Sequence, residues 1–235
     1  FSSFRVMFIS FLQTFRQVND PKILKALGFA TLFSLLSIFL ALTAGVALMD
    51  NVLDLFSSSL QSWFGRGESW FRGFAQFLGG SLILVIAYFL FAGIHGAFVG
   101  IFIDDILDAV HKKHYPDIPW QNSPSSNHSI LFSGRILLLT VILNLVASPL
   151  LILGWFIPPL GLSLQIILNG FLLGKEYGQL VEFRIPKNHS LSPPPKYFLN
   201  GMIAAFIWIV PFLNLLAPIL LAGSVLHTRA RLQKH

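Results

Sequence analysis

Residues 155–162 have the sequence WFIPPLGL, and residues 208–215 repeat its pattern as WIVPFLNL at an offset of 53 residues. The same offset relates Gly170 to Gly223. Each copy places a proline inside a long run without Asp, Glu, Lys or Arg, over residues 136–174 and 197–228. Because a proline removes a helical hydrogen bond and clashes with the preceding turn, both runs are predicted to break at these points.

The two breaks predict two helical hairpins, over residues 130–174 and 200–228, that enter a bilayer and turn inside it. Lipid tolerates freed backbone groups only where protein or water covers them. The returning arm of the first hairpin, from 161 to 174, would be about 21 Å long, shorter than a hydrocarbon core of about 30 Å. The first arm of the second, from 201 to 210, would be about 15 Å long. Two kinked helices that cross completely are the alternative.

The composition is that of an integral membrane protein. Of 235 residues, 54% are hydrophobic and 11% are charged, whereas soluble domains carry about 25% charged residues. We therefore expect an all-α integral membrane protein with one membrane domain over residues 1–235. The net charge of +6 favours orientation by the positive-inside rule and contact with anionic lipid, not with nucleic acid. The absence of cysteine excludes disulfides and thiolate metal sites.

Two segments are predicted to cross the membrane, residues 22–49 and 74–103. Asp20 and Pro21 suit the cap and first position of the first helix. Residues 26–49 are uncharged, and as a helix they would extend about 36 Å. The uncharged second segment would extend about 45 Å and would therefore tilt or protrude.

Two further segments are predicted as amphipathic helices in the membrane interface, residues 4–18 and 53–73. The first has an aromatic and aliphatic stripe at helical spacing. Its members are Phe4, Phe8, Phe11, Phe15 and Val18. With two crossings and two returning hairpins, the segments richer in Lys and Arg fall on one side, predicted to be cytoplasmic.

Several polar or small residues have two interpretations each. The sequence Gly96-Ala97-Phe98-Val99-Gly100 suits either a subunit contact or packing within one chain. His95, at membrane depth, is a functional candidate or a neutral histidine bonded to a neighbouring helix. A helix end with metal-ligand spacing is more simply a solvated terminus. Its residues are Asp104, Asp108, His111 and His114.

The best physical site for an anion is the start of the first spanning helix. Free N–H groups there carry partial positive charge, and Lys22 and Lys25 lie one above the other. The alternative is that both lysines anchor the helix at the interface, and Asp20 competes for the same N–H groups. Lys175, Glu176 and Arg184 follow the first hairpin as either a charged lining or a solvated rim.

No enzyme motif stands out. The sequence has no P-loop, HExxH or GxSxG, so we expect neither catalysis nor a bound cofactor or metal.

Three stretches of the sequence match a known family pattern. They are Asp20-Pro21-Lys22-Ile23-Leu24-Lys25, Gly174-Lys175-Glu176-Tyr177, and Val210-Pro211-Phe212-Leu213-Asn214-Leu215 with the basic tail from Arg229. On these stretches the chain resembles the CysZ-type sulfate permeases, in order along nearly its whole length. The resemblance implies two transmembrane helices with two hemi-penetrating hairpins, and an oligomer in the bacterial inner membrane.

The resemblance also implies a function, sulfate uptake for cysteine synthesis, and a site. Its sulfate site would lie at the first spanning helix, where Leu24 and Lys25 occupy two arginine positions of the family pattern. Leu24 departs from that pattern, and lysine offers a point charge where arginine offers a fork. A related oxyanion is therefore an alternative substrate. Asn214, in the second hairpin tip, joins Lys175, Glu176 and Arg184 as a candidate for the pathway.

We therefore expect a non-enzymatic permease or channel for sulfate or a similar oxyanion, assembled as a homo-oligomer. The rival interpretation is a structural membrane protein that shapes or organises lipid without ion flux, because interfacial helices and half-inserted hairpins would wedge one leaflet. A membrane enzyme is the third interpretation, for which the sequence offers no nucleophile or metal site.

Overall fold

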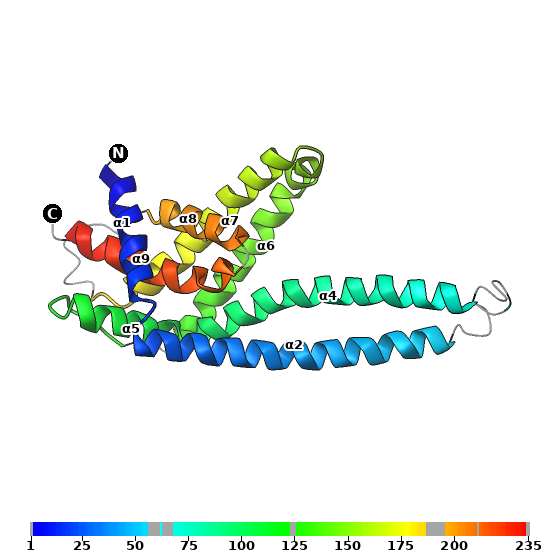
Figure 1. Ribbon diagram of the computed structural model, residues 1–235. Helices are drawn as coiled ribbons and strands as arrows, with labels where there is room; N and C mark the ends of the chain where they lie inside the picture. The colour runs from blue at the N-terminus through cyan, green and yellow to red at the C-terminus, as the bar shows by residue number, and fades with distance from the viewer. Residues whose placement is uncertain are drawn as a thin grey trace. The chain divides into compact units, whose positions relative to one another are not determined.

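The computed structural model describes residues 2–55, 62, 68–122, 126–186, 196–210 and 212–233 (Figure 1). Every regular element in these residues is a helix, so the all-α prediction is confirmed. The chain divides into two compact units, Phe1–Ala26 with Gly100–His235, and Leu27–Val99. We call them unit 1 and unit 2. That they act as one membrane domain stays a prediction.

Unit 2 is an antiparallel pair of long helices, α2 (Pro21–Leu55) and α4 (Glu68–Ile101), each of which extends into unit 1 at one end (Figure 1). The rings of Phe33 and Phe98 stack with centroids 5.4 Å apart. The position of a Cβ on Gly45 lies 3.4 Å from Ile83. The two helices thus contact each other at both of these positions.

The apolar part of α2 matches the first predicted crossing. Its residues Pro21–Leu48 are long and apolar enough to span a membrane, and few of them are buried. An exposed apolar surface of this length is typical of a helix in lipid and not of the core of a soluble protein. Helix α2 does not end at residue 49, the predicted end of this crossing, but continues to Leu55.

The second predicted crossing, residues 74–103, corresponds to α4, which begins earlier, at Glu68. A break at Phe102 separates α4 from α5 (Ile103–His114). Whether α4 crosses the membrane stays a prediction. Most of the predicted interfacial helix over 53–73 lies outside the described residues, and its last part, from Glu68, belongs to α4.

The first repeat forms a tight helical hairpin in unit 1. Helix α6 (Ser126–Phe156) is joined to α7 (Pro158–Glu182) by the single residue Ile157. The carbonyl oxygen of Ile157 accepts hydrogen bonds from the amides of Leu160 and Gly161. A Cβ on Gly154 would lie 2.4 Å from the Cα of Gly161. Glycine therefore lets the two helices approach directly beneath the turn.

The arms of this hairpin are longer than the sequence predicted. Residues Gly134–Gly154 of α6 form the second candidate membrane span, about 31 Å long. Helix α7 does not end at Lys175-Glu176 but runs to Glu182, because Gly178 and Val181 pack inside unit 1. The predicted short returning arm is therefore wrong for the first hairpin, while the depth of this hairpin in the membrane stays a prediction.

Helix α6 contains a proline that does not end it. Pro149 has no N–H, so the carbonyl oxygen of Leu145 loses its usual helical donor. The hydroxyl of Ser148 donates to that oxygen at 2.8 Å. A neighbouring hydroxyl thereby satisfies the freed carbonyl, as lipid requires.

The second repeat forms a wider hairpin. Helix α8 (Phe198–Ile209) is about 18 Å long and leads through the 3₁₀ turn η3 (Leu213–Leu215) into α9 (Ala217–Gln233). At the tip, Phe212 has φ of 66° and its side chain is 83% exposed. Such a φ is strained for a bulky residue. Both repeats thus coincide with helix breaks that present exposed aromatic residues.

Helix α9 is the centre of unit 1 and is buried along nearly its whole length. It packs against α1 (Ser2–Gln17), α5, α7 and α8 (Figure 1). Gly223 lies against Thr14 of α1, where a Cβ would be 2.3 Å from the threonine methyl. Helix α1 corresponds to the helix predicted over residues 4–18, with Phe8 and Phe15 exposed and Phe11 buried. Its place in the membrane interface stays a prediction.

The closest helix pair in unit 1 is α7 with α8. Three glycines on one face of α7, at spacings of four residues, meet the start of α8: Gly170, Gly174 and Gly178. A Cβ on Gly201 of α8 would lie 1.9 Å from the carbonyl oxygen of Gly170. We call this contact the glycine seam. It joins the two hairpins backbone to backbone.

Replacing Gly201 by alanine is expected to destabilise the protein by about 1–3 kcal/mol, because the new methyl group meets backbone that cannot move aside alone. Gly134→Ala is the matched control, since no described atom lies within 4 Å of its Cβ position. Thermal unfolding in detergent measures both. Equal thermal midpoints for Gly201→Ala and the wild type would contradict the close packing of Gly201 on α7.

Candidate functional site

The start of α2 is built as the sequence predicts, with Asp20 as its cap. The amide of Lys22 donates to Oδ1 of Asp20 at 3.1 Å. The side chain of Ile23 is 1% exposed and that of Ala26 is 4% exposed, so this first turn is anchored in unit 1. Lys22, Leu24 and Lys25 are exposed around it.

A third cation, Lys113 of α5, reaches the same point. Its Nζ lies 3.1 Å from Oδ2 of Asp20. Burial raises the pKa of the Asp20 carboxyl, but hydrogen bonds from Lys113 and from the Lys22 amide outweigh burial and hold that pKa below its usual value. Asp20 is thus ionised at neutral pH. The helix start carries three cations, Lys22, Lys25 and Lys113, around one carboxylate.

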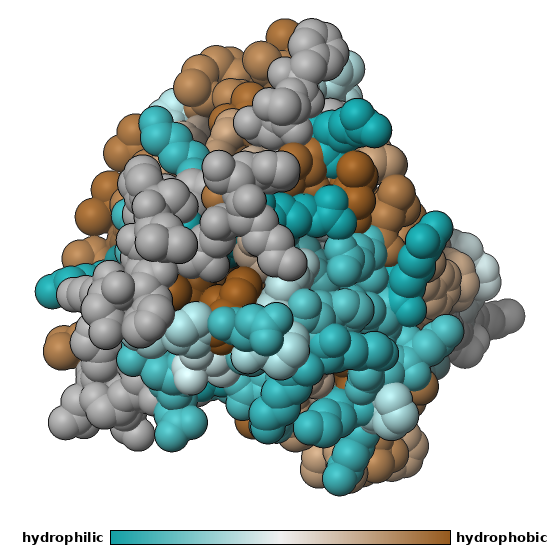
Figure 2. Space-filling model, turned by 90° about the vertical axis from the view of Figure 1, so that its left-hand side faces the viewer, coloured by the Kyte–Doolittle hydropathy of each residue, from teal (hydrophilic) through white to brown (hydrophobic). Residues whose placement is uncertain are grey.

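Next to the start of α2, a cluster of polar side chains joins α1 and α5 to α9. Gln17 bonds to His114, and the Tyr115 hydroxyl lies 2.7 Å from Nδ1 of His227. Arg231 donates to Gln13 at 2.7 Å. Figure 2 faces the end of unit 1 where α1, α5 and α9 lie in Figure 1, and hydrophilic residues gather across its centre. The helix start therefore belongs to a polar end of unit 1.

Burial and repulsion keep the imidazoles of this cluster neutral. Burial, with the charges of His114 and Arg231, lowers the pKa of His227 to about 3. Burial and the charge of Lys113 also lower the pKa of His114, against the opposing effect of Asp20. Burial raises the pKa of the Tyr115 phenol.

The four predicted pathway residues have different surroundings. Lys175 is exposed on α7, with its Nζ 6.0 Å from the centre of the Phe171 ring, and Glu176 beside it is half-buried. Arg184 is 3% exposed; it pairs with Asp108, and its guanidinium lies over Trp120. Asn214 lies half-buried in η3 at the second hairpin tip. Their role in a pathway stays a prediction.

The helix end with metal-ligand spacing has other partners. Asp108 accepts hydrogen bonds from Arg184 and from Trp120. His111 stacks on Trp120, with ring centroids 4.6 Å apart. Among the described residues, no group of three acidic, histidine or cysteine side chains is placed to hold a metal ion.

His95 and the small residues after it also have defined surroundings. His95 is 1% exposed, and its Nε2 lies 3.4 Å from the hydroxyl of Thr31 on α2. The interpretation as a histidine bonded to a neighbouring helix therefore agrees with unit 2. Around Gly96 and Gly100, no described atom lies within 4 Å of a Cβ position. Both interpretations of this GxxxG sequence, a subunit contact and packing within one chain, stay predictions.

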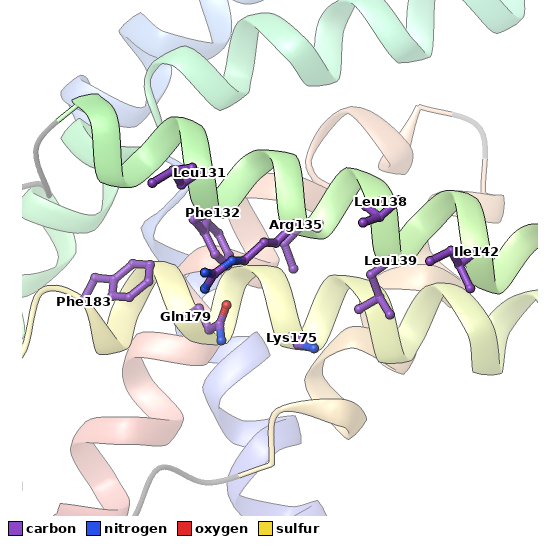
Figure 3. Close-up of a pocket in the computed structure, with 10 residues that line it drawn as sticks. Leu131, Phe132, Arg135, Leu138, Leu139, Ile142, Lys175, Gln179 and Phe183 are labelled. Carbon is purple, nitrogen blue, oxygen red and sulfur yellow. The ribbon is translucent and has the colours of Figure 1, made fainter.

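A second candidate site is a groove of about 630 Å³ between α6 and α7 (Figure 3). Most of its lining is apolar, but Arg135, Lys175 and Gln179 also line it. Figure 3 shows Arg135 reaching from α6 toward Gln179 of α7. Lys175 is one of the site residues predicted from the sequence, whereas Arg135, its companion in the groove, is not among them. The sequence does contain a sign of this pairing, since Arg135 directly precedes and Lys175 directly follows the uncharged run 136–174.

Comparison with known proteins gives one match. The family described as Sulfate transporter CysZ/Etoposide-induced protein 2.4 matches residues 10–218. No curated protein and no solved structure matches the chain.

Acidification is expected to destabilise unit 1 through His227. An unfolded histidine binds its proton near pH 6.5, whereas folded His227 binds it near pH 3. Because the unfolded chain holds more protons between these values, stability falls as pH falls from about 6.5, by up to about 1.4 kcal/mol per pH unit.

The variant His227→Asn keeps a polar group near Tyr115 and removes the titrating one. Its thermal midpoint in detergent should depend less on pH between 7 and 5 than that of the wild type. Parallel pH curves for the two proteins would show that His227 does not carry this dependence.

Proposed function

We propose that this chain, which belongs to the Sulfate transporter CysZ/Etoposide-induced protein 2.4 family, is a permease or channel for sulfate or a similar oxyanion. The family match over residues 10–218 is the observation that carries the proposal. A non-enzymatic role fits a transporter family. In this role the protein would sit as a multi-pass protein in the bacterial inner membrane and supply sulfate for cysteine synthesis.

The start of α2 is the proposed anion site. Lys22 and Lys25 supply charge beside the helix N-terminus, and Leu24 lies between them in sequence. Lys113 adds a third cation, whose Nζ lies 3.1 Å from Oδ2 of Asp20. An arriving sulfate therefore competes with Asp20 for Lys113 and for the helix amides. This competition would keep affinity moderate, as a permease requires if its substrate is to leave.

The proposed sulfate pathway passes the four residues that the sequence predicted for it, which are Lys175, Glu176, Arg184 and Asn214. Lys175 and Glu176 lie on α7, and Asn214 would supply a polar group at the otherwise apolar tip of the second hairpin. Arg184 would act from a fixed position, because Asp108 holds its guanidinium. One protomer of this size does not enclose a path by itself, so the proposal includes a homo-oligomer.

The proposed topology has both hairpins entering and leaving on the cytoplasmic side, with their tips in lipid. The 12 residues of α8 suit half a bilayer. The 21-residue apolar part of α6 is as long as the hydrocarbon core and would have to tilt. The exposed Phe8 and Phe15 of α1 would rest in the interface.

Proteoliposomes that contain the purified protein are expected to take up labelled sulfate faster than empty liposomes, with chloride flux as the control for a nonspecific leak. Uptake equal to that of empty liposomes would refute the transport proposal. Lipid scrambling without ion flux would instead favour the lipid-organising alternative.

The site itself is tested by variants with opposite effects. Lys22→Ala with Lys25→Ala should weaken sulfate binding by roughly tenfold or more, since each charged contact is worth about 1.5–3 kcal/mol. Asp20→Asn keeps a capping side chain but removes the competing charge, so sulfate binding should strengthen. Lys112→Ala, on the same helix as Lys113, is the control. Unchanged binding in the double variant would remove this site, even if sulfate uptake persists.

A further inference from the structure

The groove between α6 and α7 has its polar and apolar parts in a definite order along the hairpin. Arg135 is the second residue of the apolar span Gly134–Gly154, and Lys175 follows the apolar returning stretch of α7. Since the two helices are antiparallel about Ile157, both cations lie at the same end, far from the turn. They lie about 33 Å and 27 Å along their helices from Ile157, close to the thickness of a hydrocarbon core.

The part of the groove nearer the turn is lined only by hydrocarbon. From Arg135, the α6 wall continues toward the turn through Leu138, Leu139 and Ile142. At the opposite end, the rings of Phe132 and Phe183 pack edge to face with centroids 5.3 Å apart. The groove of this hairpin thus has a basic end, at Arg135 and Lys175, and an apolar part nearer the turn (Figure 3).

The two cations are available to an external anion. Both side chains are exposed, and within the described part of the chain no carboxylate forms an ion pair with either. Arginine offers a planar fork to a phosphate, and lysine offers a compact point charge. Gln179, one turn beyond Lys175, adds an amide that can donate to an ester carbonyl.

The apolar lining of the groove favours a phospholipid over a free inorganic anion. A free sulfate or phosphate dianion loses its hydration in an apolar groove, and that loss is costly. A phospholipid brings its own hydrocarbon, which gains from burial against the leucines at about 25 cal/mol per Å². The groove volume of about 630 Å³ lies within the range typical of ligand pockets, about 300–1,000 Å³.

We propose that the α6–α7 groove binds one anionic phospholipid, with its phosphate between Arg135 and Lys175 and one acyl chain along Leu138, Leu139 and Ile142. The lipid stabilises the open end of the first hairpin at the headgroup level of its leaflet. This site is separate from the proposed sulfate site at the start of α2 and does not depend on transport, although it shares Lys175 with the proposed pathway.

Native mass spectrometry of the full chain released from nanodiscs tests this proposal. The nanodiscs contain equal amounts of phosphatidylglycerol and phosphatidylcholine, and the readout is the ratio of the two lipids retained on the protein. The wild type should retain phosphatidylglycerol in preference. Arg135→Gln with Lys175→Gln should lower that preference at least fivefold.

Two matched double variants test whether the lipid preference depends on cations in the groove or on cations elsewhere in the protein. Arg135→Lys with Lys175→Arg keeps both cations and should keep the preference. Lys112→Gln with Lys196→Gln removes two exposed cations outside the groove and should also keep it. Equal loss in the groove variant and in this control would overturn the proposal.

A competition arm distinguishes a lipid from a free anion. Inorganic phosphate or sulfate at millimolar concentration should leave the bound phosphatidylglycerol in place, because the acyl chain contributes to its affinity. Complete displacement by inorganic phosphate, or equal retention of both lipids by the wild type, would overturn the proposal.

Discussion

The glycine seam between α7 and α8 is the contact on which unit 1 depends. Gly201 of α8 meets the backbones of Gly170 and Gly174 of α7 directly, and Gly178 leaves room for the ring of Tyr197 just before α8. In lipid, helices associate through close packing and hydrogen bonds, because burial of apolar side chains drives little association there. The seam therefore joins the two broken hairpins, and it places Tyr197 at Gly178, where its hydroxyl donates to Glu182.

The glycine seam also explains how unit 1 can bury charged and polar side chains. Arg229 of α9 is fully buried, and its Nε lies 3.0 Å from Glu182 at the end of α7. Asn200 of α8 donates to the hydroxyls of Ser224 and Thr228. A buried charge needs a partner in place before it is desolvated. The seam supplies that placement by fixing α7 and α8 against α9.

The sequence predicted the parts of the fold that depend on local chemistry. The proline repeat marks both helix breaks, and Asp20 caps α2 as predicted from Asp20 and Pro21. Arm lengths were wrong where tertiary packing extends a helix, as at Lys175, after which α7 continues because its next turns are buried.

Contacts between distant segments lay beyond sequence reasoning. Lys113 is 93 residues from Asp20, and Thr31 is 64 residues from His95, so no local pattern links either pair. The three glycines of α7, at spacings of four, were a readable sign of close packing that sequence analysis did not use. Arg135 was likewise visible at the edge of an apolar run, but only the fold places it beside Lys175 in one groove.

The central claim is that two joined hairpins keep their tips in lipid while their bases share one aqueous side. The chain has no cysteine, so single-cysteine variants at Phe156 and Phe212 report without background. With a membrane-impermeant maleimide, both tip positions should resist labelling from either face, while a cysteine at Lys112 labels from the cytoplasmic face. Rapid labelling of both tips from the opposite face would contradict the claim.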